Sequence, residues 1–289
     1  MSNIQNGLLP AAFSFGVATT QEGFDLAAHL GLYPGIAAND SGTPNVGPLV
    51  NPRNTALSTT GLDIRQVYMT FGNKELGTFT LGRNIGLFGA DVILNDMTLP
   101  GVGVAGSASG AAPANTTLGS IGLGYIYTDW LFYGSATFIS QKQEYINGAG
   151  AAYDYNGTGF DVFAKIDVED LEAFAYYYHG SGLGTTGLFI LSDDGSGNTR
   201  DSDGFLVQAT YKVGAVKFGV NYGESKLDLA NGEVSPTLVA KNRKVTGGIY
   251  DSLTKNLTLL AEVSDVHADA HNGNSDHSTN FNIGAFLSF

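Results

Sequence analysis

The stretch Asn280-Phe281-Asn282-Ile283-Gly284-Ala285-Phe286-Leu287-Ser288-Phe289 ends the chain. Side chains of a strand alternate between its two faces, so the apolar residues at odd numbers share one face and the asparagines share the other. One face of this strand therefore meets an apolar environment. The same alternation recurs at Val216–Gly223, Phe205–Val213 and Phe160–Asp167. Strands of this kind, separated by turns and long polar loops, are typical of a transmembrane β-barrel.

The connections between the predicted strands alternate in length. Further strands are predicted at 11–19, 24–34, 61–72, 77–84, 118–127, 130–140, 170–180, 241–251, 256–267 and 279–289. Short turns are expected near 20–23, 73–75, 128–129, 167–170, 214 and 252–255, and long connections near 34–60, 84–117, 140–155, 180–201, 228–240 and 268–279. In outer-membrane barrels, short turns lie at one rim and long loops at the other.

The predicted fold is all-β, with residues 1–289 forming a single outer-membrane domain. This domain is an antiparallel transmembrane barrel of about fourteen strands, within a range of roughly twelve to sixteen. Residues 1–10 read as a loop, although the topology requires a strand before 11–19. We therefore expect that an N-terminal strand and a signal peptide are missing; the alternative is a poorly patterned strand inside residues 1–10.

The composition excludes several classes of protein. Charged residues make up 14% of the chain, against roughly 25% in typical soluble domains. No apolar run of about 18 residues is present, which excludes a helical membrane span. The net charge of −13 argues against nucleic acid as a partner and favours cations in a pore. A soluble β-sandwich is the alternative fold, but it does not require alternating short and long connections.

The most specific stretch is Gly77–Gly86, GTFTLGRNIG, which continues through Asp91 to Asn95-Asp96-Met97-Thr98-Leu99-Pro100. It resembles the general-diffusion porins of Gram-negative outer membranes, in which a Gly-Arg-Asn-x-Gly strand end leads into a long loop with an Asp-Met element. Ile64–Gly72, followed by Leu76–Phe79, is similar to the hairpin that precedes this loop. The resemblance implies that residues 85–117 fold into the barrel lumen and narrow the pore.

The resemblance also implies a constriction in which acidic loop residues face basic residues of the wall. Arg83 matches the wall arginine and Asp96 matches the loop acid. Asp91 and Arg65 are further candidates for the constriction. Opposed charges across a narrow gap create a field that orients dipolar solutes. Strand parity would point Arg83 toward lipid, so we expect a bulge at Gly82 that turns it inward.

Strand parity alone predicts further side chains in a water-filled lumen. They are Asp25, His29, Lys165, Glu172, Lys212, Lys217 and Glu262. Most are expected to be ordinary water-facing residues of a polar interior.

Two loop segments carry clustered oxygen or nitrogen ligands. Asp193–Gly197 with Asp201 and Asp203 could hold Ca²⁺, but it lacks the spacing of an EF-hand and reads as a solvated acidic loop. Asp265–His271 with Asp276 and His277 contains the donors of a zinc site, yet a surface loop rarely preorganises one. We predict no metal site and no cofactor. Because catalytic motifs are absent, we also predict no enzymatic activity.

The sequence therefore predicts a passive outer-membrane channel for small hydrophilic solutes and ions, with a mild cation preference. Expected partners are the lipid bilayer and lipopolysaccharide. The resemblance implies a homotrimer with a latch at Pro34–Thr60. One alternative is a substrate-selective channel in which Gly101–Ala114 packs into the lumen. The other is a non-conducting structural or adhesion barrel.

Overall fold

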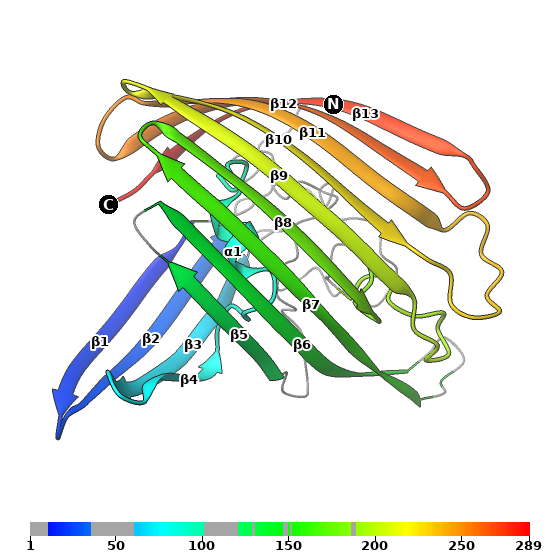
Figure 1. Ribbon diagram of the computed structural model, residues 1–289, viewed down its shortest axis with the longest axis horizontal. Coiled ribbons are helices and arrows are strands. Elements are labelled where there is room, and N and C mark those ends of the chain that lie inside the picture. Colours follow the sequence, from blue (N-terminus) through cyan, green and yellow to red (C-terminus); the bar gives the residue numbers. More distant parts are fainter. Residues whose placement is uncertain are drawn as a thin grey trace. The chain divides into compact units, whose positions relative to one another are not determined.

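The computed structural model describes residues 11–35, 61–100, 121–128, 131–146, 150, 152–185 and 189–289. The chain divides into two compact units, Met1–Ile85 and Gly86–Phe289. The described residues of each unit form their own antiparallel sheet, with strands in chain order (Figure 1). Residues 36–60 of the predicted latch and 101–117 of the predicted constriction loop lie outside the described residues.

The first unit contains a four-stranded sheet. Its strands are β1 (Phe13–Gln21), β2 (Phe24–Gly35), β3 (Gly61–Asn73) and β4 (Gly77–Arg83). Val17, Met69 and Leu81 lie on one exposed apolar face, linked through the register of neighbouring strands. The opposite face carries small and polar side chains, including those of Thr20 and Thr70.

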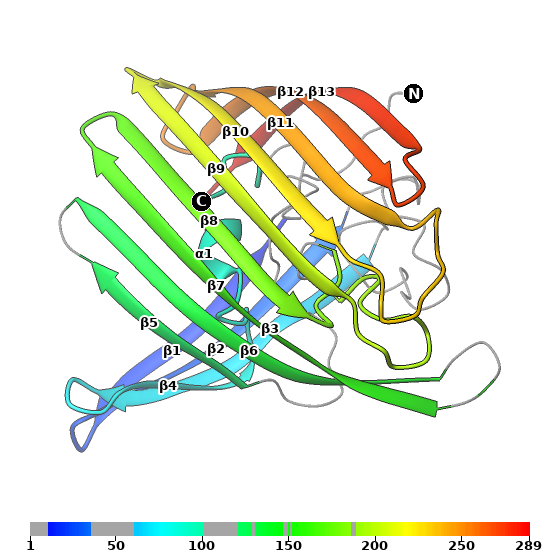
Figure 2. The same cartoon turned by 45° about the vertical axis from the view of Figure 1, so that its right-hand side comes forward.

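The second unit contains a nine-stranded sheet and one short helix, α1 (Ala90–Asn95). Its strands are β5 (Ile121–Thr128), β6 (Phe132–Ile146), β7 (Ala152–Val168), β8 (Leu171–Ser181), β9 (Asp201–Val213), β10 (Val216–Leu227), β11 (Val239–Ser252), β12 (Leu257–Ala270) and β13 (Ser275–Leu287). The sheet curves, and α1 lies on its concave side (Figure 2). Among the described ranges, no helix is long and apolar enough to cross a membrane.

The two faces of the nine-stranded sheet differ in polarity. On β7, Asp161 and Phe163 are buried on the concave face, whereas Phe160 and Val162 remain more than two-fifths exposed on the convex face. The exposed convex face also carries Phe138, Tyr177, Val207, Tyr211, Phe218, Val220, Val245, Ile249, Leu259, Val263, Phe281 and Ile283. An apolar outer face and a polar inner face are the pattern of a membrane barrel.

The apolar band of the convex face ends at paired positions of β10 and β11. Tyr222 lies opposite Val245, and the next outward-facing pair is Glu224 and Arg243. A tyrosine at this level, such as Tyr222, suits a boundary between lipid and water.

The structure confirms the all-β prediction, because every predicted strand overlaps a strand of the described chain. A closed barrel of about fourteen strands stays a prediction.

Two predicted long connections are wrong. Most of 140–155 belongs to β6 and β7, and the connection in 268–279 is a tight turn between Ala270 and Ser275. The ladder continues there because backbone hydrogen bonds do not require apolar side chains, as the His267–His277 pair shows.

The predicted bulge at Gly82 is also wrong. The β3–β4 register runs without interruption from the Val67–Arg83 pair. Gly82 instead adopts a φ of 127°, and a Cβ there would lie 2.4 Å from the Val67 carbonyl oxygen. The bulge lies in β3, where Gly31 pairs with Gln66 but Leu32 pairs with Ile64, so Arg65 is the inserted residue.

Candidate functional site

Residues 87–100, here called the docked segment, lie against the concave face of the nine-stranded sheet. The segment enters α1 at Gly89, which has a φ of 71°, and leaves it at the extended Asp96. The Gly89 backbone N–H donates a 2.6 Å hydrogen bond to Asp161 Oδ2. Thr137 and Tyr176 donate to the same carboxylate. A carboxylate of the wall therefore fixes the start of the helix.

Apolar side chains also attach the docked segment to the concave face. Phe88 and Val92 are almost fully buried, in one cluster with Phe163, Tyr178 and Leu206. The Phe88 and Tyr178 rings meet edge-to-face with centroids 6.2 Å apart. Full burial of a large apolar side chain contributes about 1.5–3 kcal/mol. Docking therefore has an apolar as well as a polar basis.

Asp91, predicted at the constriction, is bonded to the wall by both carboxylate oxygens. Tyr133 Oη donates to Asp91 Oδ1 at 2.9 Å, and Ser135 Oγ donates to Asp91 Oδ2. Both donors lie on β6. Asp91 thus anchors α1 to the sheet.

Asp96, the predicted loop acid, is buried where the segment leaves α1. Its Oδ1 accepts from the Thr98 backbone N–H at 2.9 Å and from Thr98 Oγ1 at 2.8 Å. Asn221 Nδ2 on β10 donates to the same oxygen at 3.1 Å. These bonds close a tight turn and fix it to the wall.

Met97 completes the attachment. Its backbone N–H donates to Gln208 Oε1 at 2.8 Å, and Gln208 Nε2 donates to the Asn95 carbonyl at 2.9 Å. The Met97 side chain packs with Tyr250 and Leu260 in a second buried cluster. No pattern in the sequence identified Gln208, Asn221 or Asp161 as partners of this loop. Strand parity could have placed them on the polar face, but not beneath the loop.

Lys244 is a further residue of this site that was not predicted from the sequence. It is 5% exposed on β11 and lies within electrostatic reach of Asp96 and Glu262. Tyr250 Oη donates to Glu262 Oε1 at 2.7 Å. Lys244 and Val245 are adjacent on β11, so their side chains point to opposite faces of the sheet. The sequence alone could therefore have placed Lys244 on the polar concave face.

The structure places the predicted lumen residues of the second unit on the concave face. Lys165 Nζ lies 3.3 Å from both Asp167 Oδ2 and Glu172 Oε2. Lys212 and Lys217 are directly opposite each other on β9 and β10. The Lys217 ammonium lies 5.2 Å from the centroid of the Tyr250 ring, which is a cation–π distance. Glu262 lies in the buried charge cluster that it forms with Lys244 and Asp96. Whether these residues line a pore stays a prediction.

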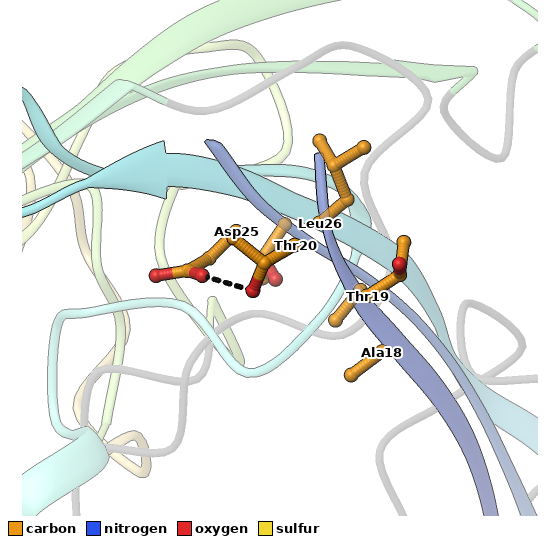
Figure 3. Close-up of a pocket in the computed structure, with 7 residues that line it drawn as sticks. Ala18, Thr19, Thr20, Asp25 and Leu26 are labelled. Atoms are coloured by element: carbon orange, nitrogen blue, oxygen red, sulfur yellow. Dashed lines mark hydrogen bonds between the residues drawn. The ribbon is translucent and has the colours of Figure 1, made fainter. Parts of the chain in front are cut away.

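The remaining predicted residues belong to the first unit. Asp25 lines a shallow hollow of about 330 Å³ and accepts a 2.7 Å hydrogen bond from Thr20 Oγ1 (Figure 3). His29 stacks on Tyr68 with ring centroids 4.6 Å apart. Arg83 ends β4 with an exposed side chain. The Arg65 side chain lies outside the described part of the chain. The expected opposition of Arg83 to the loop acids stays a prediction.

The two candidate metal segments have other arrangements. Asp193 and Asp194 accept backbone hydrogen bonds within their own turn. His267 lies 2.6 Å from Asp265 and stacks on His277. Among the described residues, no group of three or more His, Cys, Asp or Glu side chains is arranged to hold a metal ion.

Comparison with known sequences gives two matches. A family model described as Gram-negative porin matches residues 6–286. "Porin-like protein H" of Photobacterium profundum is 27% identical over 187 residues, which cover 65% of this chain and 51% of that protein. The chain thus spans about half the length of this curated relative.

Solved structures show the same fold at low sequence identity. The outer membrane channel DcaP of Acinetobacter baumannii has a TM-score of 0.68 at 14% identity, with 97% of this chain and 85% of that chain covered. An anion-selective porin from Comamonas acidovorans has a TM-score of 0.65 at 12% identity, with 98% and 90% covered. The in-vitro folded trimer form of OmpT from Vibrio cholerae has a TM-score of 0.50 at 14% identity, with 99% and 98% covered.

Proposed function

The chain belongs to the Gram-negative porin family, and from this premise we propose that it is a channel of the bacterial outer membrane that small hydrophilic solutes and ions cross passively, with a mild preference for cations. The proposed channel is one barrel domain of about fourteen strands. It requires no cofactor and has no enzymatic activity. Its convex apolar face contacts the lipid bilayer, and its charged outer margin contacts lipopolysaccharide.

The observation that carries this proposal is the docked segment on the polar concave face. Wall side chains from β6 to β10 hold it through hydrogen bonds to Asp91, Asp96 and Met97. A loop fixed in this way reduces the cross-section available to solutes, and residues 85–117 are the proposed constriction loop. Its proposed charged residues are Asp91 and Asp96 on the loop, with Arg83 and Arg65 on the wall.

The cation preference is supported by charge. The chain carries a net −13, and both acids of the docked segment lie on the concave face with Asp161 and Glu262. A negative potential raises the local concentration of cations. Lys165, Lys212, Lys217 and Lys244 reduce this potential, which is why the proposed preference is mild.

A homotrimer is the proposed assembly. The support is the family membership, together with the solved OmpT structure described as a trimer form. Residues 34–60 are the proposed latch onto a neighbouring subunit.

The test is the reversal potential of single channels in a salt gradient across a planar bilayer. Asn is nearly isosteric with Asp and retains hydrogen-bonding groups, so Asp91→Asn with Asp96→Asn removes charge at little steric cost. We expect the reversal potential of the double variant to lie closer to zero than that of the native protein. Asp154→Asn is the matched control, because Asp154 is exposed on the convex face of β7.

Equal reversal potentials for the native protein and the double variant would reject the selective role of the two acids. Absence of stepwise currents from folded native protein would reject the channel itself.

A further inference from the structure

The connection between β8 and β9 also packs on the concave face. Its described residues are 182–185 and 189–200, here called the β8–β9 loop. Leu183 is fully buried and belongs to the same apolar cluster as Phe88 and Val92 of the docked segment. Phe189 packs against this cluster. Two stretches that are far apart in sequence therefore share one apolar core on the polar side of the sheet.

Three glycines of the wall make room for these side chains. A Cβ on Gly159 would lie 2.5 Å from Leu183 Cδ1, and a Cβ on Gly180 would lie 2.4 Å from the same atom. Gly159 and Gly180 are directly opposite each other on β7 and β8. A Cβ on Gly157 would lie 2.4 Å from Phe189 Cε1. The wall thus has a depression that Leu183 and Phe189 fill.

The loop backbone adopts strained conformations in this position. Phe189 and Leu191 have φ values of 59° and 60°, a region that costs a bulky residue about 1–2 kcal/mol. Such a conformation persists only where surrounding contacts fix it. The Phe189 N–H donates to the Leu183 carbonyl at 2.6 Å, and the Thr185 N–H donates to the Ile190 carbonyl at 2.9 Å.

A buried ion pair holds the other end of the loop. Arg200 Nε and Nη2 donate to the two carboxylate oxygens of Glu233 at 2.8 and 2.5 Å, and both side chains are 7% exposed. Arg200 Nη1 also donates to the Leu191 carbonyl at 2.9 Å. Tyr155 and Ser192 join their hydroxyl groups in a further hydrogen bond to the wall. The loop is therefore attached at both ends.

We propose that the β8–β9 loop is a second inserted element that narrows the conduction path beside the docked segment, with Leu183 and Phe189 as the residues that set its position. The proposal rests on the channel function proposed above. Solute size is then limited by two elements whose apolar side chains meet in one cluster. Loosening the β8–β9 loop widens the path while the hydrogen bonds of Asp91 and Asp96 remain.

The first experiment compares native protein with Leu183→Ser/Phe189→Ser in planar bilayers. The double variant should increase single-channel conductance by about 1.5-fold or more and should admit larger neutral polyethylene glycols. Unchanged conductance and polymer exclusion in a variant that still shows heat-modifiable migration in gels would overturn the proposal. Absence of currents from the native protein would instead reject the channel function.

The second experiment leaves the packing intact. Leu191 is 39% exposed, and the chain has no cysteine, so Leu191→Cys introduces a single thiol. The unlabelled variant is the matched control and should conduct like the native protein. Attachment of a bulky methanethiosulfonate reagent should reduce the current in discrete steps. A current that does not change after complete labelling would count against the loop lying in the path.

Discussion

At the scale of single residues, the acids of the docked segment have two roles. Asp91 accepts hydrogen bonds from Tyr133 and Ser135, and Asp96 accepts from Thr98 and Asn221. Each acid therefore attaches the segment to the wall and also charges the concave face. Truncation to alanine would remove both contributions, whereas asparagine removes mainly the charge.

Lys244 provides a sharper test of the buried electrostatics. Lys244→Met removes the cation that Asp96 and Glu262 face, and breaking a buried charge cluster typically costs about 3–5 kcal/mol. We expect the free energy of unfolding, measured by urea denaturation in micelles, to fall by about this amount. We also expect a stronger cation preference in reversal-potential measurements.

The matched control for this variant is Lys226→Met. Lys226 is half exposed on the convex face, where its ammonium lies 3.8 Å from Glu224. Exposed pairs contribute roughly 0–1 kcal/mol. If Lys244→Met unfolds at the same urea concentration as the native protein, the cluster does not stabilise the docked segment.

At the scale of elements, strands were predictable and loop contacts were not. Val216–Gly223 shows its two faces in the sequence because the alternation is local. The partners of the docked segment on the sheet are 42 to 125 residues away, as the Asp91–Tyr133 and Asp96–Asn221 bonds show. No local pattern specifies such a pairing. Asp91 and Asp96 were identified through family resemblance, whereas Lys244 required the position of the loop.

The ion pair that connects two loops predicts a dependence on pH. The hydrogen bond from Arg200 lowers the pKa of the Glu233 carboxyl from 4.5 to about 2, with help from Ser235 and the Ala230 N–H, although burial raises this pKa. Because the folded pKa is depressed, the stabilisation is complete above about pH 4.5. It is lost as the pH falls through about 2.

The measurement is an NMR titration of the Arg200 Nε–H signal in micelles from pH 6 to pH 2. The signal should persist at pH 4 and change near pH 2, and Glu233→Gln should abolish this transition. Glu75→Gln, in an exposed turn of the first unit, should leave it unchanged. A midpoint near 4.5 would mean that the pair is solvated and does not hold the loops together.

At the scale of the whole molecule, the family resemblance read from Gly77–Gly86 is confirmed by the match over residues 6–286.

The positions of β-bulges were harder to predict. The sequence favoured Gly82 because glycine tolerates unusual backbone angles, yet the inserted residue is Arg65. A bulge depends on how neighbouring strands align, and this alignment is decided by the whole sheet rather than by one residue type.

The proposed trimer is tested by native mass spectrometry of detergent-refolded protein. The expected species has three times the 30.2 kDa mass of the chain. Deletion of residues 36–60 should shift the distribution toward one chain, since this stretch is the proposed latch. A single-chain mass for the full-length protein across detergents would contradict the trimer.

The docked segment also has a consequence for the order of folding. Its anchors on β7, β9 and β10 follow it in the chain by up to 125 residues, and contacts of long sequence separation form slowly. During synthesis the segment emerges before the strands that receive it. In the proposed channel, the aperture therefore reaches its final width only after these strands have paired, and we expect an assembly intermediate that lacks β10 to have a wider and leakier lumen than the mature protein.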